Sequence, residues 1–152
     1  MIGMLYSFSI ANQAQTAAKT VVEYASPSDA VTTIERCWIT QTTFDTSENL
    51  GSTLQRIATT GTGTATTPRP YSAGFAAAGG TGKTNHTIEP IYATPVLWDN
   101  GFNVLSGMLW TPANDDEVIA ISPSTLAGMN LDVAPSGSMS FDYGMTIREI
   151  GG

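Results

Sequence analysis

The sequence predicts an all-β fold, an antiparallel β-sandwich of the jelly-roll kind, and three observations lead to this prediction. Short runs in which apolar and polar residues alternate recur along the chain, for example in residues 4–10 and 53–59, and a period of two is typical of strands. Clusters of Gly, Pro, Asn, Asp and Ser, which favour turns, separate these runs. No convincing helical periodicity interrupts them, so the spacing indicates a sandwich.

The runs with strand character follow one another at short intervals. They are, in order, residues 4–10, 20–25, 31–44, 53–59, 87–98, 102–110, 117–121, 130–133 and 138–150. The run 31–44 is the longest, and its mixed faces are those expected of a strand in the middle of a sandwich. Pro90 and Pro95 reduce 87–98 to an edge or bulged strand. Asp99-Asn100-Gly101 then predicts a hairpin turn into the next strand.

A long segment rich in Thr, Gly, Ala and Pro separates the two halves of the chain. We expect residues 61–86 to form one long mid-chain loop, and a loop of this length is usually either a binding loop or disordered. A long crossover in the middle and tight hairpins near the end are compatible with a Greek-key path. The 152 residues suffice for a single domain with its own core, spanning 1–152.

Composition excludes several classes of partner. The chain has 13 acidic and 6 basic residues, a net charge of −7, and no basic stripe that could follow phosphates, which argues against nucleic acid and anionic membrane surfaces. Cys37 is the single cysteine, so no intrachain disulfide is expected, and we interpret it as a small buried hydrophobe. The first residues resemble no signal peptide, and we therefore expect synthesis in a cytoplasm.

Two motifs invite a catalytic interpretation. Gly79-Gly80-Thr81-Gly82-Lys83-Thr84 resembles the end of a phosphate-binding loop, but Ala77 stands where that motif needs glycine, and we expect a flexible loop. His86 is the only histidine, so a hydrolase would have to use it. Its place beside the long loop favours an exposed structural histidine. We expect no enzyme activity, no catalytic residues, no cofactor and no small-molecule substrate.

Two further clusters have a functional and a structural interpretation. Asp115-Asp116-Glu117 could hold a calcium ion, but no ligand spacing accompanies it, and we interpret it as a solvated turn without a metal. Trp38, Trp98 and Trp110 could form a platform on which a sugar stacks. Their flanking residues are typical of strands, which favours a place in the core.

The stretch Thr67-Pro68-Arg69-Pro70-Tyr71 within the expected loop is a candidate interface. Prolines lower the entropic cost of docking, and Arg and Tyr are common anchors at interfaces. The alternative interpretation, a floppy connector, stays open. Together with neighbouring residues the candidate contacts are Pro68, Arg69, Pro70, Tyr71, Phe75, Met4 and Tyr6.

Four segments carry a resemblance to a known family. They are YSFSIANQAQTAAKTVVEYASPSDAVTTIERCWITQT (6–42), TPRPYSAG (67–74), EVIAISPSTLAGMNLDV (117–133) and SGSMSFDYGMTIREI (136–150). The chain thereby resembles the small capsid decoration (cement) proteins of tailed bacteriophages. This resemblance rests on general pattern and implies a jelly-roll or sandwich virion protein, assembly into trimers and a place on the outer surface of the capsid. It implies no catalytic residues.

Two functions from different classes therefore compete. In the first, a homo-trimer binds the major capsid protein and stabilises the head by bridging its subunits, because weak contacts made by several subunits at once add up to firm attachment. In the second, the chain is a carbohydrate- or receptor-binding module of a tail fibre or an adhesin. Exposure of Trp98 or Trp110 beside Asp or Asn would favour the second function.

Overall fold

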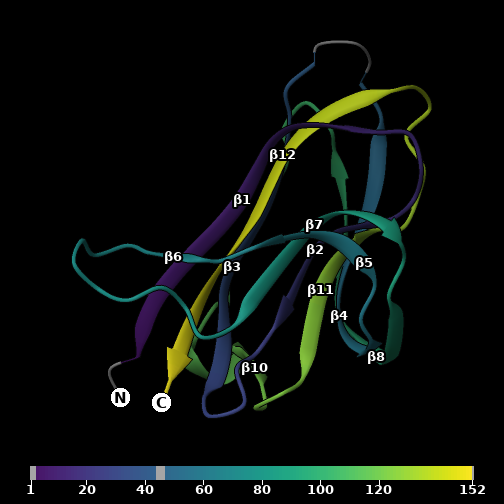
Figure 1. Cartoon of the computed structure of the whole chain (residues 1–152). Coiled ribbons are helices and arrows are strands. Elements are labelled where there is room, and N and C mark those ends of the chain that lie inside the picture. Colours follow the sequence, from purple (N-terminus) through teal and green to yellow (C-terminus); the bar gives the residue numbers. More distant parts are fainter. Residues whose placement is uncertain (1–2, 44–46, 152) are drawn as a thin grey trace.

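The protein is a sandwich of two antiparallel sheets in the computed structural model, which describes residues 3–43 and 47–151 (Figure 1). Each sheet has six strands, and every strand pair runs antiparallel. The prediction of an all-β sandwich is confirmed. Phe44, the last residue of the longest expected strand, lies outside the described residues.

The strands divide between a sheet A and a sheet B. Sheet A has the order β10 (Ile119–Ile121), β3 (Val31–Gln41), β12 (Met139–Ile150), β1 (Met4–Gln15) and β6 (Arg69–Pro70), with β9 (Met108–Trp110) also paired to β3. Sheet B has the order β5 (Thr62–Thr66), β7 (Thr81–Ile88), β2 (Thr20–Ala25), β11 (Leu126–Leu131), β4 (Asn49–Thr59) and β8 (Ile91–Asn103). A 3₁₀ turn, η1, covers Asp115–Glu117.

The strand order is that of a jelly roll with an insertion. β1 pairs with β12, β2 with β11, β3 with β9 and β10, and β4 with β8. The chain thus folds back on itself as a ribbon whose two halves alternate between the sheets, which is how two Greek keys close a jelly roll. The insertion lies between β4 and β8, and its strands extend both sheets: β5 and β7 extend sheet B, and β6 extends sheet A.

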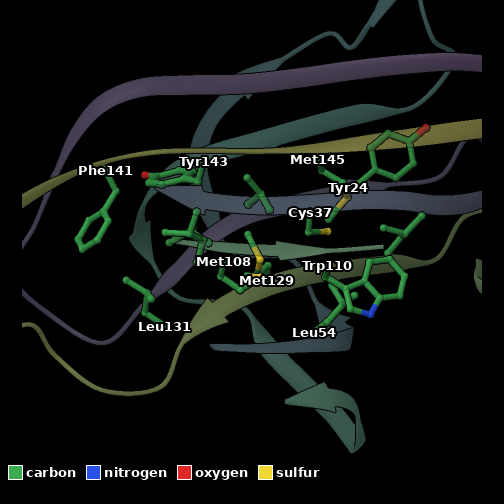
Figure 2. Packing of buried hydrophobic residues seen from close by; sticks show 14 of the residues in the cluster. Tyr24, Cys37, Leu54, Met108, Trp110, Met129, Leu131, Phe141, Tyr143 and Met145 are labelled. Atoms are coloured by element: carbon green, nitrogen blue, oxygen red, sulfur yellow. The ribbon is translucent and has the colours of Figure 1, made fainter. Parts of the chain in front are cut away.

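The core lies between the two sheets and follows the strand alternation. From β12, Phe141, Tyr143 and Met145 face Met129 and Leu131 of β11 across the interior (Figure 2), and all five are fully buried. Two tryptophans, Trp98 and Trp110, contribute to this core. Trp110 is buried, and Trp98, which is partly buried, packs against Trp110 with 6.5 Å between the ring centroids.

The prediction of one long loop over residues 61–86 is wrong. The segment contains β5, β6 and β7, and its longest strand-free stretch is limited to residues 71–80. Its Thr-rich ends have β propensity, and β2 and β1 each offer an unpaired edge for them. β7 therefore pairs with β2 on one side and β5 on the other.

The hairpin predicted at Asp99-Asn100-Gly101 is also displaced. These residues lie inside β8, where Gly101 pairs with Gly51 of β4. The chain turns after β8 instead, and the amides of Ser106 and Gly107 donate to the carbonyl of Asn103. Gly107 has a φ of 69°, which glycine adopts at little cost. The edge position predicted for the proline-containing strand is confirmed, because β8 ends sheet B.

Candidate binding surface

The insertion forms an arm, defined here as residues 67–80, that leaves sheet A and returns to sheet B. Its outgoing part is held by β6, in which Arg69 pairs with Ser7 and Pro70 with Tyr6 of β1. The Tyr71 amide adds a hydrogen bond of 3.1 Å to the Leu5 carbonyl. The stretch between β6 and β7 then extends away from the sandwich, at the left of Figure 1. The arm is thus exposed in the middle and fixed where it starts.

A buried carboxylate fixes the arm where it returns. Glu149 Oε1 accepts hydrogen bonds from the Tyr24 hydroxyl at 2.6 Å and the Gly80 amide at 2.9 Å, while Oε2 accepts from the Gly79 amide at 3.0 Å. Burial raises the pKa of Tyr24, and its bond to Glu149 raises it further, so the hydroxyl stays a donor. Because β12 carries Glu149 and β2 carries Tyr24, this contact joins the arm to both sheets.

The same contact bears on the resemblance to a phosphate-binding loop. The Gly79 and Gly80 amides, which would face a phosphate, already donate to Glu149. Residues 81–88 form strand β7 where the motif requires a helix. The predicted flexible loop is therefore a clamped turn followed by a strand.

The structure separates the predicted interface residues into exposed and buried ones. Arg69, Tyr71 and Phe75 are exposed, with Tyr71 at 58% and Phe75 at 53%. Pro70 and Met4 are half-buried, and Met4 packs on the core. Pro68 and Tyr6 are buried, and their assignment as contacts is corrected here. Tyr6 is not a surface residue because its side chain lies on the inward face of β1, the same face as that of Phe8.

Sequence reasoning missed a hollow on the outer face of sheet A. A cavity of about 450 Å³ is lined by Arg36, Trp38 and Thr40 of β3, Ser7 of β1, Tyr71 of the arm, and Ser106, Met108 and Leu109 near β9. A second cavity of about 410 Å³ shares Ser7 and Tyr71 and adds Phe8, Ser9, Arg69 and Pro70. The alternation of Arg36, Trp38 and Thr40 along one face of a central strand is the signal that could have found it.

Tyr71 lies between the two cavities, and a hydrogen bond to sheet A holds its side chain in place. Its hydroxyl shares a hydrogen bond of 3.2 Å with Thr146 of β12. That bond lowers the pKa of the Tyr71 hydroxyl, and the nearby Arg36 charge acts in the same direction. Tyr71 therefore connects the arm to the outer face of sheet A.

The expectation of an exposed His86 is wrong. Its side chain lies in β7, is fully buried, and places Nε2 at 3.0 Å from Glu23 Oε2. The Gly61 amide donates to the same carboxylate, Thr60 donates its hydroxyl, and Lys83 Nζ lies 3.6 Å away. These residues enclose the buried pair, and the arrangement ties β2, β7 and the β4–β5 turn together.

The remaining candidates lie apart from this surface. Asp115, Asp116 and Glu117 are exposed on η1, where the Asn114 side chain caps the turn. Over residues 3–43 and 47–151 no cluster of His, Cys, Asp and Glu has the arrangement of a metal site.

Cys37 gives a direct check of the predicted core. Its thiol is buried between the sheets, and burial raises its pKa. We expect no reaction with a water-soluble thiol reagent in the native protein and stoichiometric reaction after unfolding in urea. Rapid labelling of the native protein would contradict this packing.

In the part of the chain that the structure describes, no helix combines the length and the apolar character needed to cross a membrane. No protein-family model, curated protein or solved structure matches the chain.

Proposed function

We propose that the protein is a structural virion protein that binds the outer surface of a phage capsid, as a homo-trimer, and stabilises the head by bridging major capsid protein subunits. The sequence resemblance supports the proposal, and so does the jelly-roll fold, an architecture found among viral capsid domains. The observation that carries it is the arm: exposed anchor residues on a segment clamped at both ends.

The clamped ends make the arm suitable for binding. Exposed Tyr and Arg side chains are favoured anchors in interfaces, and the arm carries the exposed residues Arg69, Tyr71 and Phe75. A segment whose ends are already ordered loses less conformational entropy on docking than a free loop does. In a trimer three identical arms would engage the repeating capsid lattice at once, and each further contact would be effectively intramolecular.

Co-sedimentation with expanded, empty phage heads tests this function. We expect the wild-type protein to pellet with the heads and Phe75→Ala to bind them at least about tenfold more weakly, because aromatic anchors carry much of an interface's energy. Val133→Ala is the matched control, since Val133 is also 53% exposed but lies outside the arm. Loss of binding is expected only for Phe75→Ala. A protein that stays monomeric and is not retained on heads would refute the proposal.

A carbohydrate- or receptor-binding module is the second candidate function. Trp98 and Trp110, expected to be exposed in that case, pack in or against the core. Trp38 is the tryptophan available for sugar stacking, because it lines the larger cavity on the outer face of sheet A.

A further inference from the structure

We propose that the outer face of sheet A binds a carboxylate-bearing saccharide in a groove, which we call the outer groove, formed by the two cavities on either side of Tyr71. This inference rests on the second candidate function and goes beyond it by naming the site and the ligand class. The two cavities are adjacent, because Ser7 and Tyr71 line both of them.

Trp38 forms the floor of the outer groove. It pairs with Gly144 of β12, and a Cβ atom at Gly144 would lie only 2.4 Å from Trp38 Cζ2. The indole ring therefore lies down across the sheet, over the glycine, instead of standing away from it. A ring held in this way presents one face to a ligand without loss of rotamer freedom on binding. The flat, apolar face of a sugar ring is complementary to such a surface.

Two arginines give the groove its charge preference. Arg69, Ser7, Thr146 and Arg36 are successive cross-strand neighbours on the outer face, in the order β6, β1, β12, β3. Three strand spacings place the two arginine backbones about 14 Å apart. Across the described ranges, neither arginine has a carboxylate at ion-pair distance. Two uncompensated cations in a chain of net charge −7 favour a ligand with more than one anionic group.

The remaining lining is partly apolar, with Met108 and Leu109 in the larger cavity and Phe8 and Pro70 in the smaller one, and partly hydroxylic. Ser7, Thr40 and Ser106 line the larger cavity, and Ser9 lines the smaller one. Hydroxyls both donate and accept hydrogen bonds, which suits the hydroxyl groups of a saccharide. No acidic residue lines either cavity among the residues described. Arginine forks can then bind carboxylates without competition.

Calorimetric titration of the full chain with trigalacturonate tests the outer groove. We expect binding that weakens with added salt, and at least tenfold weaker binding of the fully methyl-esterified trisaccharide, which keeps the rings but lacks the charges. Arg36→Gln and Trp38→Ala should each weaken trigalacturonate binding by tenfold or more. Arg56→Gln, an exposed arginine on sheet B, is the control and should leave it unchanged.

A second set of measurements guards against misfolding and against other ligands. Trp38→Phe keeps a ring, and we expect it to bind within a few-fold of wild type and to identify the Trp38 indole NMR signal that shifts on titration. Equal binding of the ester, no shift of that signal, or tighter binding of hexaglutamate, an acidic peptide, would overturn the proposal. Arg36→Gln should leave head co-sedimentation intact, so that the groove and the capsid function can fail separately.

Discussion

Replacement of Glu149 by Ala is expected to lower the free energy of unfolding by about 3 kcal/mol or more, since a buried donor left without its acceptor costs about 1–3 kcal/mol. The Tyr24 hydroxyl and the Gly80 amide would both lose their partner inside the protein. The Tyr24 side chain is completely buried, so bulk water is not at hand to replace the lost acceptor. Glu149→Gln keeps one acceptor oxygen and should cost less.

Urea unfolding and amide hydrogen exchange together measure this effect. The midpoint should fall for Glu149→Ala, and in addition the Gly79 and Gly80 amides should lose protection before the strands do, since the return of the arm is released. Glu35→Ala is the matched control: Glu35 forms a half-exposed ion pair of 2.9 Å with Arg148 of the same strand β12, and such pairs contribute about 0–1 kcal/mol. An unchanged midpoint for Glu149→Ala would show that the clamp is energetically irrelevant.

The release should also weaken capsid binding if the arm is the contact. Glu149→Ala leaves Arg69, Tyr71 and Phe75 in place but frees one end of the segment that carries them. Docking would then have to order the arm as well as contact it, which costs affinity. A binding loss without a missing side chain would therefore separate preorganisation from direct contact.

Local sequence pattern predicted the strands whose two faces differ most. β12, expected at residues 138–150, spans Met139–Ile150, and its alternation matches a buried row from Met139 to Ile147. β1, β2 and β3 begin within a residue of the expected positions. In these strands alternate side chains face the core and the solvent, so the alternation of apolar and polar residues in the sequence predicts the strand directly.

Pairing with distant strands decided the elements that the sequence did not reveal. Residues 62–66 and 81–88 carry few apolar side chains. Residues 81–88 form β7 because the distant strand β2 offers them an edge, and residues 62–66 form β5 because they pair with β7 in turn. Asp99-Asn100-Gly101 has the composition of a tight turn, but its pairing with β4 continues through Gly51. A scale of residue propensities does not include the strand with which a segment pairs, so it cannot predict these elements.

The sequence alone predicts only part of the candidate site, because cross-strand pairing determines which side chains share its surface. The sequence draws attention to Arg69, which lies between two prolines, and to Tyr71, which follows the second of them. Trp38 and Arg36 were hidden in a strand, where an aromatic residue usually points into the core. Only the register shows that these side chains face outward, because it sets Trp38 over Gly144 and Arg36 beside Thr146, which in turn pairs with Ser7.

Glu23→Gln is expected to lower the free energy of unfolding at neutral pH by about 3 kcal/mol, the lower end of what breaking a buried charge pair costs. Glu23 is buried and accepts from the Gly61 amide at 3.2 Å and contacts His86 Nε2 at 3.0 Å. Gln offers one oxygen in place of two and carries no charge for Lys83. Glu117→Gln, on the exposed turn η1, is the control and should change stability by less than about 0.5 kcal/mol.

The pH dependence of this loss identifies the charge as its cause. Burial alone would raise the pKa of Glu23, but the bonds from His86, Thr60 and Gly61, with the Lys83 charge, outweigh it and leave the pKa below its ordinary value of 4.5. A carboxylate with a lowered folded-state pKa contributes stability that is complete above the unfolded-state pKa and disappears as the pH falls through the folded-state pKa.

Urea unfolding from pH 7 to pH 3 should therefore show wild type and Glu23→Gln converging once the pH passes below about 4.5, because protonated glutamate and glutamine are then equally uncharged. Above that pH the gap should stay constant as far as this group is concerned. Two curves that remain parallel down to pH 3 would mean that Gln disturbs packing, and that the Glu23 charge contributes nothing to the junction of β2, β7 and the β4–β5 turn. Convergence would instead assign the stability of that junction to the ionised, buried carboxylate of Glu23.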